Sequence, residues 1–192
     1  GKSVEIPLRS TASTYPKNMD DAQLALSSFG QFDDRVTPLQ IAMMSAAIAN
    51  GGKLMKPNLI ENVQSANLSS LFAPSPSEFS SPVSATTAEK IKKMMIAAVA
   101  SGVSSNGAIK GTPVAGKTGT AQNPHGKNHS LFVSFAPKDN PKIAIAVLVE
   151  NGGFGATWAA PIANLMIEKY LLGKTESSKP SMEERILKSV IE

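Results

Sequence analysis

The chain of 192 residues contains no cysteine. This absence excludes disulfide bonds and thiolate metal sites, and it is compatible with an extracytoplasmic location. Long hydrophobic runs are missing as well. The longest purely apolar stretch, residues 143–149, is far shorter than the ~20 residues that a helix needs to span a bilayer. No segment of the sequence therefore has the length and apolarity of a membrane-spanning helix.

Aromatic residues and net charge are both scarce. Phe, Trp and Tyr make up 5% of the residues, and 19 basic against 15 acidic side chains leave a formal net charge of +4. The charges are interspersed without a basic block, so the composition does not favour nucleic-acid binding. The apolar fraction of 42% is near the norm for globular proteins, and the length suffices for one domain with its own core.

The first residues, Gly1-Lys-Ser-Val4, lack an initiator methionine and the hydrophobic segment of a signal peptide. We therefore expect the chain to be an excised part of a longer protein.

Apolar periodicity and turn residues predict four helices, four strands and a long surface excursion in the first 173 residues. We expect helices near residues 19–28, 37–49, 86–99 and 157–172, strands near 56–63, 113–122, 129–135 and 142–150, and a Ser- and Pro-rich excursion at 65–86. Thr37-Pro38 is a typical helix start, with a capping hydroxyl ahead of proline at the first helical position. Thr86 and Glu89 have the spacing of a capping box for the next helix.

The last three predicted strands follow one another with short connections. Such connections require antiparallel neighbours, because a parallel crossover needs a dozen residues or more. With helices before and after the strands, the order predicts an α+β fold in which helices flank an antiparallel sheet. We expect Trp158 to anchor the last helix in the core.

Gly116-Lys117-Thr118-Gly119-Thr120 is the most informative stretch, because it fits two unrelated chemistries. Counted from Gly111, it spells G-x-x-x-x-G-K-T, the P-loop pattern, which requires a strand before the loop and a helix after it. The preceding residues 101–110 are polar and glycine-rich, and Gly119, Pro124 and Gly126 all fall within eight residues of Thr118. A helix there would lose about 3 kcal/mol at the proline and about 1 kcal/mol at each glycine. This context argues against nucleotide binding.

Counted from Lys117, the same residues spell K-T-G-T, the third signature of serine acyl-transferases that react with penicillin. As an edge strand, the segment would pair with an extended peptide. Lys117 would offer a positive charge and Thr118 a hydroxyl to a substrate carboxylate. The Thr120 amide would be aimed at the oxygen that becomes negative during acyl transfer. An ordinary strand with a solvated lysine is the alternative that the motif alone leaves open.

His125 and His129 lie in a turn-like segment, residues 123–129. No carboxylate lies nearby to complete a ligand set, so we expect neither a metal nor a cofactor. A loop at the rim of a cleft, touching substrate, is the better interpretation.

Several motifs occur together in an order that closely resembles the penicillin-binding proteins, and best the class B transpeptidases, which cross-link peptidoglycan. They are Gly30-Gln31, Thr37-Pro-Leu-Gln-Ile-Ala42, Ala49-Asn-Gly-Gly52, Pro57, Lys117-Thr-Gly-Thr-Ala-Gln122, Ala136-Pro137 and Asn151-Gly-Gly153. The resemblance extends from residue 27 through residue 173. It implies the β-lactamase and transpeptidase fold, a five-stranded antiparallel sheet flanked by helices, of which this chain would hold an incomplete C-terminal portion.

The family's mechanism uses three motifs, and this chain departs from that pattern. S-x-x-K supplies the serine that attacks the D-Ala-D-Ala peptide bond and the lysine that takes its proton. No Ser is followed three residues later by Lys anywhere in the chain. S-x-N normally lies far upstream of K-T-G, so we interpret Ser65-Ala-Asn67 and Ser104-Ser-Asn106 as coincidences. Without S-x-x-K, no acyl-enzyme is expected to form on this polypeptide.

The resemblance implies that residues 1–173 are the C-terminal portion of a transpeptidase domain, followed by a polar linker and short helix at 174–192. In the active site, Lys117, Thr118 and Thr120 would bind the substrate carboxylate or a β-lactam, and the K-T-G-T strand, Gly119 included, would supply the oxyanion amide. The nucleophilic serine and general-base lysine would come from the missing N-terminal half of the domain.

The implied partners are that missing half, the D-Ala-D-Ala stem peptide, β-lactam antibiotics and other cell-wall synthesis proteins. The implied location is the extracytoplasmic face of the bacterial cell membrane, with the parent protein anchored by an N-terminal segment absent here. A non-catalytic binding or regulatory module on the same fold is the alternative, and a P-loop nucleotide-binding protein is a remote one.

Overall fold

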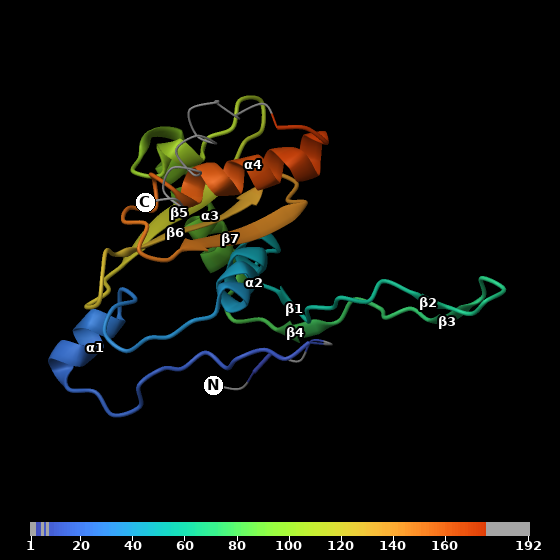
Figure 1. The fold of residues 1–192 in the computed structure, drawn as a ribbon, viewed down its shortest axis with the longest axis horizontal. Coiled ribbons are helices and arrows are strands. Elements are labelled where there is room, and N and C mark those ends of the chain that lie inside the picture. The colour runs from blue at the N-terminus through green and yellow to red at the C-terminus, as the bar shows by residue number, and fades with distance from the viewer. Residues whose placement is uncertain (1–2, 5, 7, 176–192) are drawn as a thin grey trace. The chain divides into compact units, whose positions relative to one another are not determined.

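The structure is a computed structural model that describes residues 3, 4, 6 and 8–175. Contacts divide the chain into two compact units, residues 1–93 and 94–192. The boundary falls within one long helix, α3 (Ala85–Ser101), which is labelled in Figure 1. Most of the polar linker and short helix predicted at 174–192 lies outside the described residues.

The first unit contains two helices whose starts follow from their capping residues. Helix α1 (Asp21–Ser27) begins with a capping box, in which the side chains of Asp20 and Gln23 each accept the other residue's backbone N–H. Helix α2 (Pro38–Ala49) begins as predicted, because the Thr37 side chain accepts the Gln40 N–H at 3.2 Å. Both helices lie close to their predicted bounds.

The core of this unit is small. Its buried residues lie on α2 and on the strand that follows: Met43, Ala47 and Leu54, with Val4 and Leu39 packed against them. Gly52 follows α2 with a φ of 94°, in the left-handed region that favours glycine, and a Cβ on this residue would collide with the carbonyl of Val83. Glycine is therefore favoured after α2, at position 52, both by the backbone conformation and by the close approach of Val83.

Four short strands form two antiparallel pairs in the first unit. Strand β1 (Leu54–Met55) pairs with β4 (Glu78–Ser80), and β2 (Val63–Gln64) pairs with β3 (Ser70–Phe72). The β2–β3 pair lies at the far end of an excursion whose base is the β1–β4 pair (Figure 1). The predicted strand at 56–63 is wrong, since most of that segment has no strand partner. The excursion is mostly exposed as expected, but it contains β3 and β4, which its polar composition concealed.

Helix α3 begins two residues earlier than the predicted capping box allows. The Ser84 Oγ accepts the Thr87 N–H at 3.1 Å, so Ser84 caps the helix and Thr86 lies inside it. The capping box assigned to Thr86 and Glu89 is therefore wrong. Ser84, Thr86 and Thr87 are all residue types that favour an N-cap position, and the sequence alone does not decide among them.

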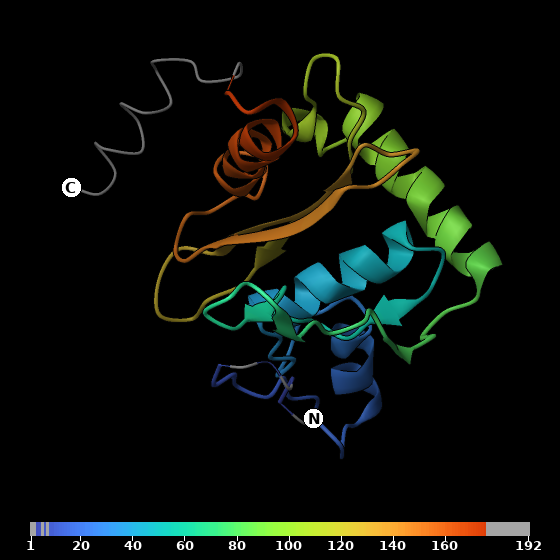
Figure 2. The ribbon, with the colours of Figure 1, turned by 90° about the vertical axis from the view of Figure 1, so that its right-hand side faces the viewer.

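The second unit is built on a three-stranded antiparallel sheet. Strands β5 (Ala115–Ala121), β6 (His129–Ala136) and β7 (Ile143–Val149) lie in that order, close to their predicted bounds. A 3-10 helix, η1 (Ser105–Gly107), precedes β5, and α4 (Ala159–Leu172) follows β7. Figure 2 shows the sheet nearly edge-on, with α4 (red) along one face. This is the α+β arrangement that the sequence predicts.

The core of the second unit lies between α4 and the sheet. Its fully buried apolar helix residues are small or β-branched: Ala159, Ala160, Ala163 and Ile167. Alanines allow the helix to approach the sheet closely, and Phe132 of β6 fills the space beneath them. Trp158 is half-buried at the N-cap position of α4, so the expected central anchor is provided by the alanine face instead. Within the described residues, no helix is both long and apolar enough to cross a membrane.

Candidate functional site

The K-T-G-T residues lie on β5, at one edge of the three-stranded sheet (Figure 1). The strand runs straight through Lys117 and Thr118, where a P-loop would need a helix to begin. The segment before it contains η1 and an isolated bridge between Ile109 and Thr112, in place of a buried strand. The P-loop interpretation is therefore wrong, and the prediction that the motif lies on an edge strand is confirmed.

Successive side chains of β5 point to opposite faces of the sheet. Thr118 lies opposite Phe132 of β6, which belongs to the core beneath α4, so Thr118 and Thr120 share the face that α4 covers. Lys117 lies on the other face. Its side chain is exposed, and its Nζ donates to the carbonyl oxygen of Thr118 at 2.8 Å. The ammonium group is therefore held beside the strand.

The outer edge of β5 carries a residue that the sequence interpretation set aside. The Thr118 N–H donates to Ser104 Oγ at 3.0 Å, and the two hydroxyl oxygens lie 3.3 Å apart. The Thr118 N–H therefore points away from β6, toward the side of β5 where the described residues place no neighbouring strand. Because backbone N–H groups along a strand point alternately to its two sides, the Thr120 N–H has the same direction. This direction is the one that the oxyanion role of Thr120 requires.

The loop after the K-T-G-T strand is tied to the end of β7. Asn123 Nδ2 donates to Asn151 Oδ1 at 2.6 Å, and the Asn151 N–H donates to His129 Nδ1 at 3.0 Å. Asn151 has a φ of 55°, an uncommon conformation that asparagine tolerates better than most residues. His129 thus has a structural hydrogen bond within this loop. Among the described residues, no three His, Cys, Asp or Glu side chains gather as a metal would require.

The two S-x-N sequences lie in different structural environments. Ser65 and Asn67 bond to each other within the β2–β3 hairpin, as expected of turn residues. Ser104 instead contacts the K-T-G-T strand, while the Asn106 side chain donates to the carbonyl of Ala156 at 2.8 Å. The interpretation of Ser104-Ser-Asn106 as a coincidental match to S-x-N stays a prediction, but its first serine contacts the K-T-G-T strand. The contact joins residues fourteen apart in sequence, and no local pattern signals it.

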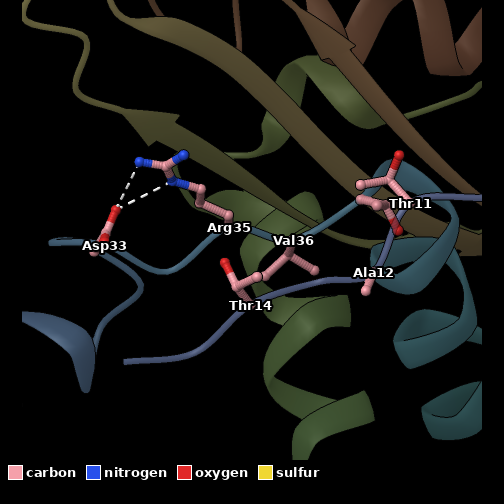
Figure 3. Close-up of a pocket in the computed structure, with 7 residues that line it drawn as sticks. Thr11, Ala12, Thr14, Asp33, Arg35 and Val36 are labelled. Carbon is pink, nitrogen blue, oxygen red and sulfur yellow. Dashed lines mark hydrogen bonds and ion pairs between the residues drawn. The ribbon is translucent and has the colours of Figure 1, made fainter. Parts of the chain in front are cut away.

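A separate hollow of about 590 Å³ lies within the first unit, lined by Thr11, Ala12, Thr14, Asp33, Arg35, Val36 and Thr37 (Figure 3). Two segments form it, joined by the backbone bridge between Thr14 and Arg35. The charged groups in it, Arg35 and Asp33, pair with each other at 3.0 Å, and both side chains are largely exposed. Paired, solvated charges add little binding energy for a ligand, so this hollow is a weaker candidate than β5.

The chain is similar to known proteins both in sequence and in fold. Over 173 residues the chain is 39% identical to the peptidoglycan D,D-transpeptidase PbpA of Mycolicibacterium smegmatis, which covers 84% of this chain and 35% of that protein. Penicillin-binding protein A of Mycobacterium tuberculosis, solved as an imipenem acyl-enzyme, matches with a TM-score of 0.80 at 38% identity. Its penicillin G acyl-enzyme matches with a TM-score of 0.79 at 36% identity.

These two structures each cover 86% of this chain, and the match takes in 38% and 39% of their own chains. The chain thus spans about a third of the length of the curated relatives that it matches. Residues 1–168 match the family described as the penicillin-binding protein transpeptidase domain. With these matches and a shared fold, the chain belongs to the penicillin-binding protein transpeptidase family and covers part of its domain.

Proposed function

We propose that this chain is part of a peptidoglycan D,D-transpeptidase that cross-links cell-wall peptides through a serine acyl-enzyme. The observation that carries the proposal is that the K-T-G-T residues lie along β5, which is the edge strand of the three-stranded sheet in the described part of the chain. An extended peptide can add to such an edge by main-chain hydrogen bonds. Family membership and the β-lactam acyl-enzymes of a relative support the same conclusion.

We assign the recognition of substrate to three residues of β5. Lys117 supplies the positive charge and Thr118 the hydroxyl that bind the terminal carboxylate of the stem peptide or of a β-lactam. The Thr120 amide stabilises the oxyanion of the tetrahedral intermediate. Gly119 lies between these two threonines and adds no side chain to the strand. The three residues recognise the substrate and do not attack it.

The nucleophile belongs to another part of the proposed parent protein. This chain has no S-x-x-K sequence, so we propose that it is inactive alone and that an upstream half of the domain supplies the serine and its lysine. Residues 1–173 would then be the C-terminal portion of the domain, with a linker and helix at 174–192. The family's sheet has five strands, and the three strands here leave two for the upstream half.

The remaining proposals concern the setting of the parent protein. Its substrates would be D-Ala-D-Ala stem peptides and its inhibitors β-lactams. Its partners would be other cell-wall synthesis proteins, at the extracytoplasmic face of the bacterial membrane. A membrane anchor would lie in the upstream part of the parent.

A labelled penicillin tests the proposal directly. The label is incubated with this chain alone and with the longer protein that we propose contains it, here termed the complete protein. We expect a covalent adduct on the complete protein only, lost after preincubation with unlabelled penicillin. An adduct on neither would favour a non-catalytic module on the same fold. An adduct on the isolated chain would refute its proposed inactivity.

A further inference from the structure

We propose that Ser104 is a positioning residue, which sets the hydroxyl of Thr118 to donate its proton to the substrate carboxylate. The inference rests on the proposed function of β5 and adds to it a residue outside the K-T-G-T motif. Ser104 has no exposed surface, so it acts on substrate only through Thr118. Its role is therefore to orient the residue that binds the substrate.

The first observation is the direction of the Ser104 side chain. Ser104 occupies the N-cap position of η1, where a serine hydroxyl ordinarily accepts a backbone N–H of the helix it caps. Here the side chain makes no such cap bond. Its Oγ instead accepts the Thr118 N–H at 3.0 Å and lies 3.3 Å from Thr118 Oγ1. The Ser104 side chain therefore bonds to β5 and does not cap η1.

Either hydroxyl of the pair could be the donor, and a bound carboxylate selects between the two arrangements. A serine hydroxyl has one proton and two lone pairs. The Thr118 amide occupies one lone pair of Ser104, and the Ser104 proton has Thr118 Oγ1 as its neighbour. When Ser104 donates to Thr118 Oγ1, the proton of Thr118 is left for an external acceptor. A carboxylate accepts and never donates, so bound substrate selects this arrangement.

The reverse arrangement explains why Ser104 matters. If Thr118 donated to Ser104, its proton would be spent within the protein and its lone pairs would face the carboxylate. Without Ser104, the Thr118 amide at the outer edge would lose its partner, and the hydroxyl would be free to turn toward that amide. Either change weakens the bond between Thr118 and an anionic group.

Ser104 is itself held firmly by its surroundings. Its N–H donates to the Ala98 carbonyl at 3.1 Å, and its carbonyl accepts the Gly107 N–H at 2.8 Å. The η1 segment is joined to α4, because the buried Asn164 side chain donates to the Asn106 carbonyl at 2.9 Å. A support fixed on both sides can hold a recognition group to the narrow tolerance that binding requires.

Acylation kinetics of the complete protein test this role, with benzylpenicillin and its methyl ester as paired probes. The ester keeps the reactive ring but removes the anionic carboxylate. We expect Ser104→Ala to slow acylation by the acid about ten-fold, as the loss of one hydrogen bond to a charged group implies. Acylation by the ester, already slow in the wild type, should change less than two-fold, and Ser104→Thr should keep most of the rate with the acid.

A purely structural role would slow acid and ester alike, and that result would overturn the proposal. The ratio of the two rates is measured within each folded variant, so a loss of stability in Ser104→Ala does not confuse it. A second cycle uses Thr118→Val. We expect the double variant to acylate no more slowly than Thr118→Val alone, because Ser104 acts through the Thr118 hydroxyl. Additive losses would contradict this dependence.

The same measurements separate this proposal from the proposed function. A wild-type complete protein that forms no adduct with benzylpenicillin would refute the function itself. A wild type that acylates normally, with Ser104→Ala unchanged toward the acid, would refute only the role of Ser104.

Discussion

The backbone of Gly155 lies against the peptide unit of Gly119, in the middle of the K-T-G-T strand. A Cβ on Gly155 would come within 2.6 Å of the Gly119 carbonyl oxygen and would also collide with the carbonyl oxygen of Leu131 on β6. The segment that leads into α4 thus crosses the sheet where two motif residues, Thr118 and Thr120, flank a glycine. Both contact atoms are backbone oxygens, so neither can move away from an added methyl group at low energetic cost.

We therefore expect Gly155→Ala to destabilise the protein by about 2–3 kcal/mol or more, the cost of forcing a methyl group into a closed contact. The measurement is chemical denaturation of the complete protein. Gly111→Ala is the control, because Gly111 has open space around its Cβ position and a positive φ, so that this variant measures backbone strain without a collision. It should lose only about 1 kcal/mol from backbone strain. Equal losses in the two variants would mean that the contact on Gly119 is not tight.

Phe132 gives a prediction about the core beneath the candidate site. Its ring is 1% exposed, and Cβ atoms added to Gly107 or Gly116 would collide with it. Phe132→Ala should therefore cost about 3–5 kcal/mol, because it removes a large buried ring and leaves a cavity. Phe154→Ala is the control, since that side chain is 70% exposed, and its unfolding free energy should change little. Similar losses in both would contradict the core assignment.

Much of this site could be predicted from the sequence. The K-T-G-T letters, the short connections and the apolar runs predict an edge strand in an antiparallel sheet, because each depends on residues close together in the chain. The contact of Ser104 with Thr118 could not be predicted in this way. It depends on how η1 folds back along β5, and the letters of Ser104-Ser-Asn106 suggest only a polar turn.

The fold shows the same division between local and tertiary signals. Thr37-Pro38 starts α2 as predicted, since a cap is decided within one turn of helix. The apolar residues buried on α4 are alanines and Ile167, whereas the larger Met166 and Tyr170 are 52% and 64% exposed. Hydropathy favours large side chains for the core, but close approach of helix and sheet favours alanine. That choice depends on the packing distance, which no single segment specifies.

The tie between Asn151 and the loop after β5 leads to a graded prediction. Asn151→Gly keeps the positive φ but loses the bond from Asn123, whereas Asn151→Ala loses that bond and strains the backbone as well. We expect the unfolding free energy to fall in the order wild type, Gly, Ala, with the alanine variant down by about 1–3 kcal/mol. Hydrogen exchange of residues 122–128 should accelerate in both variants.

Asn140→Ala is the control for this series, because Asn140 is exposed in the turn between β6 and β7. Its exchange at 122–128 should match the wild type. If Asn151→Gly left the protection of that loop intact, the side-chain bond between the two asparagines would have no part in ordering it.

Lys117 provides the sharpest test of the recognition role. Its side chain is exposed and bonds only locally, to the Thr118 carbonyl, so Lys117→Ala should leave the melting temperature nearly unchanged. Acylation of the complete protein by penicillin should nevertheless fall by about 100-fold, the usual effect of removing a group aimed at developing or bound negative charge. Lys110→Ala, another exposed lysine of the same unit, should keep the full rate. If Lys117→Ala were still labelled, Lys117 would be an ordinary solvated lysine without a role in recognition. Another cation would then have to bind the carboxylate. A melting temperature that fell together with the rate would point instead to a structural role for its bond along β5.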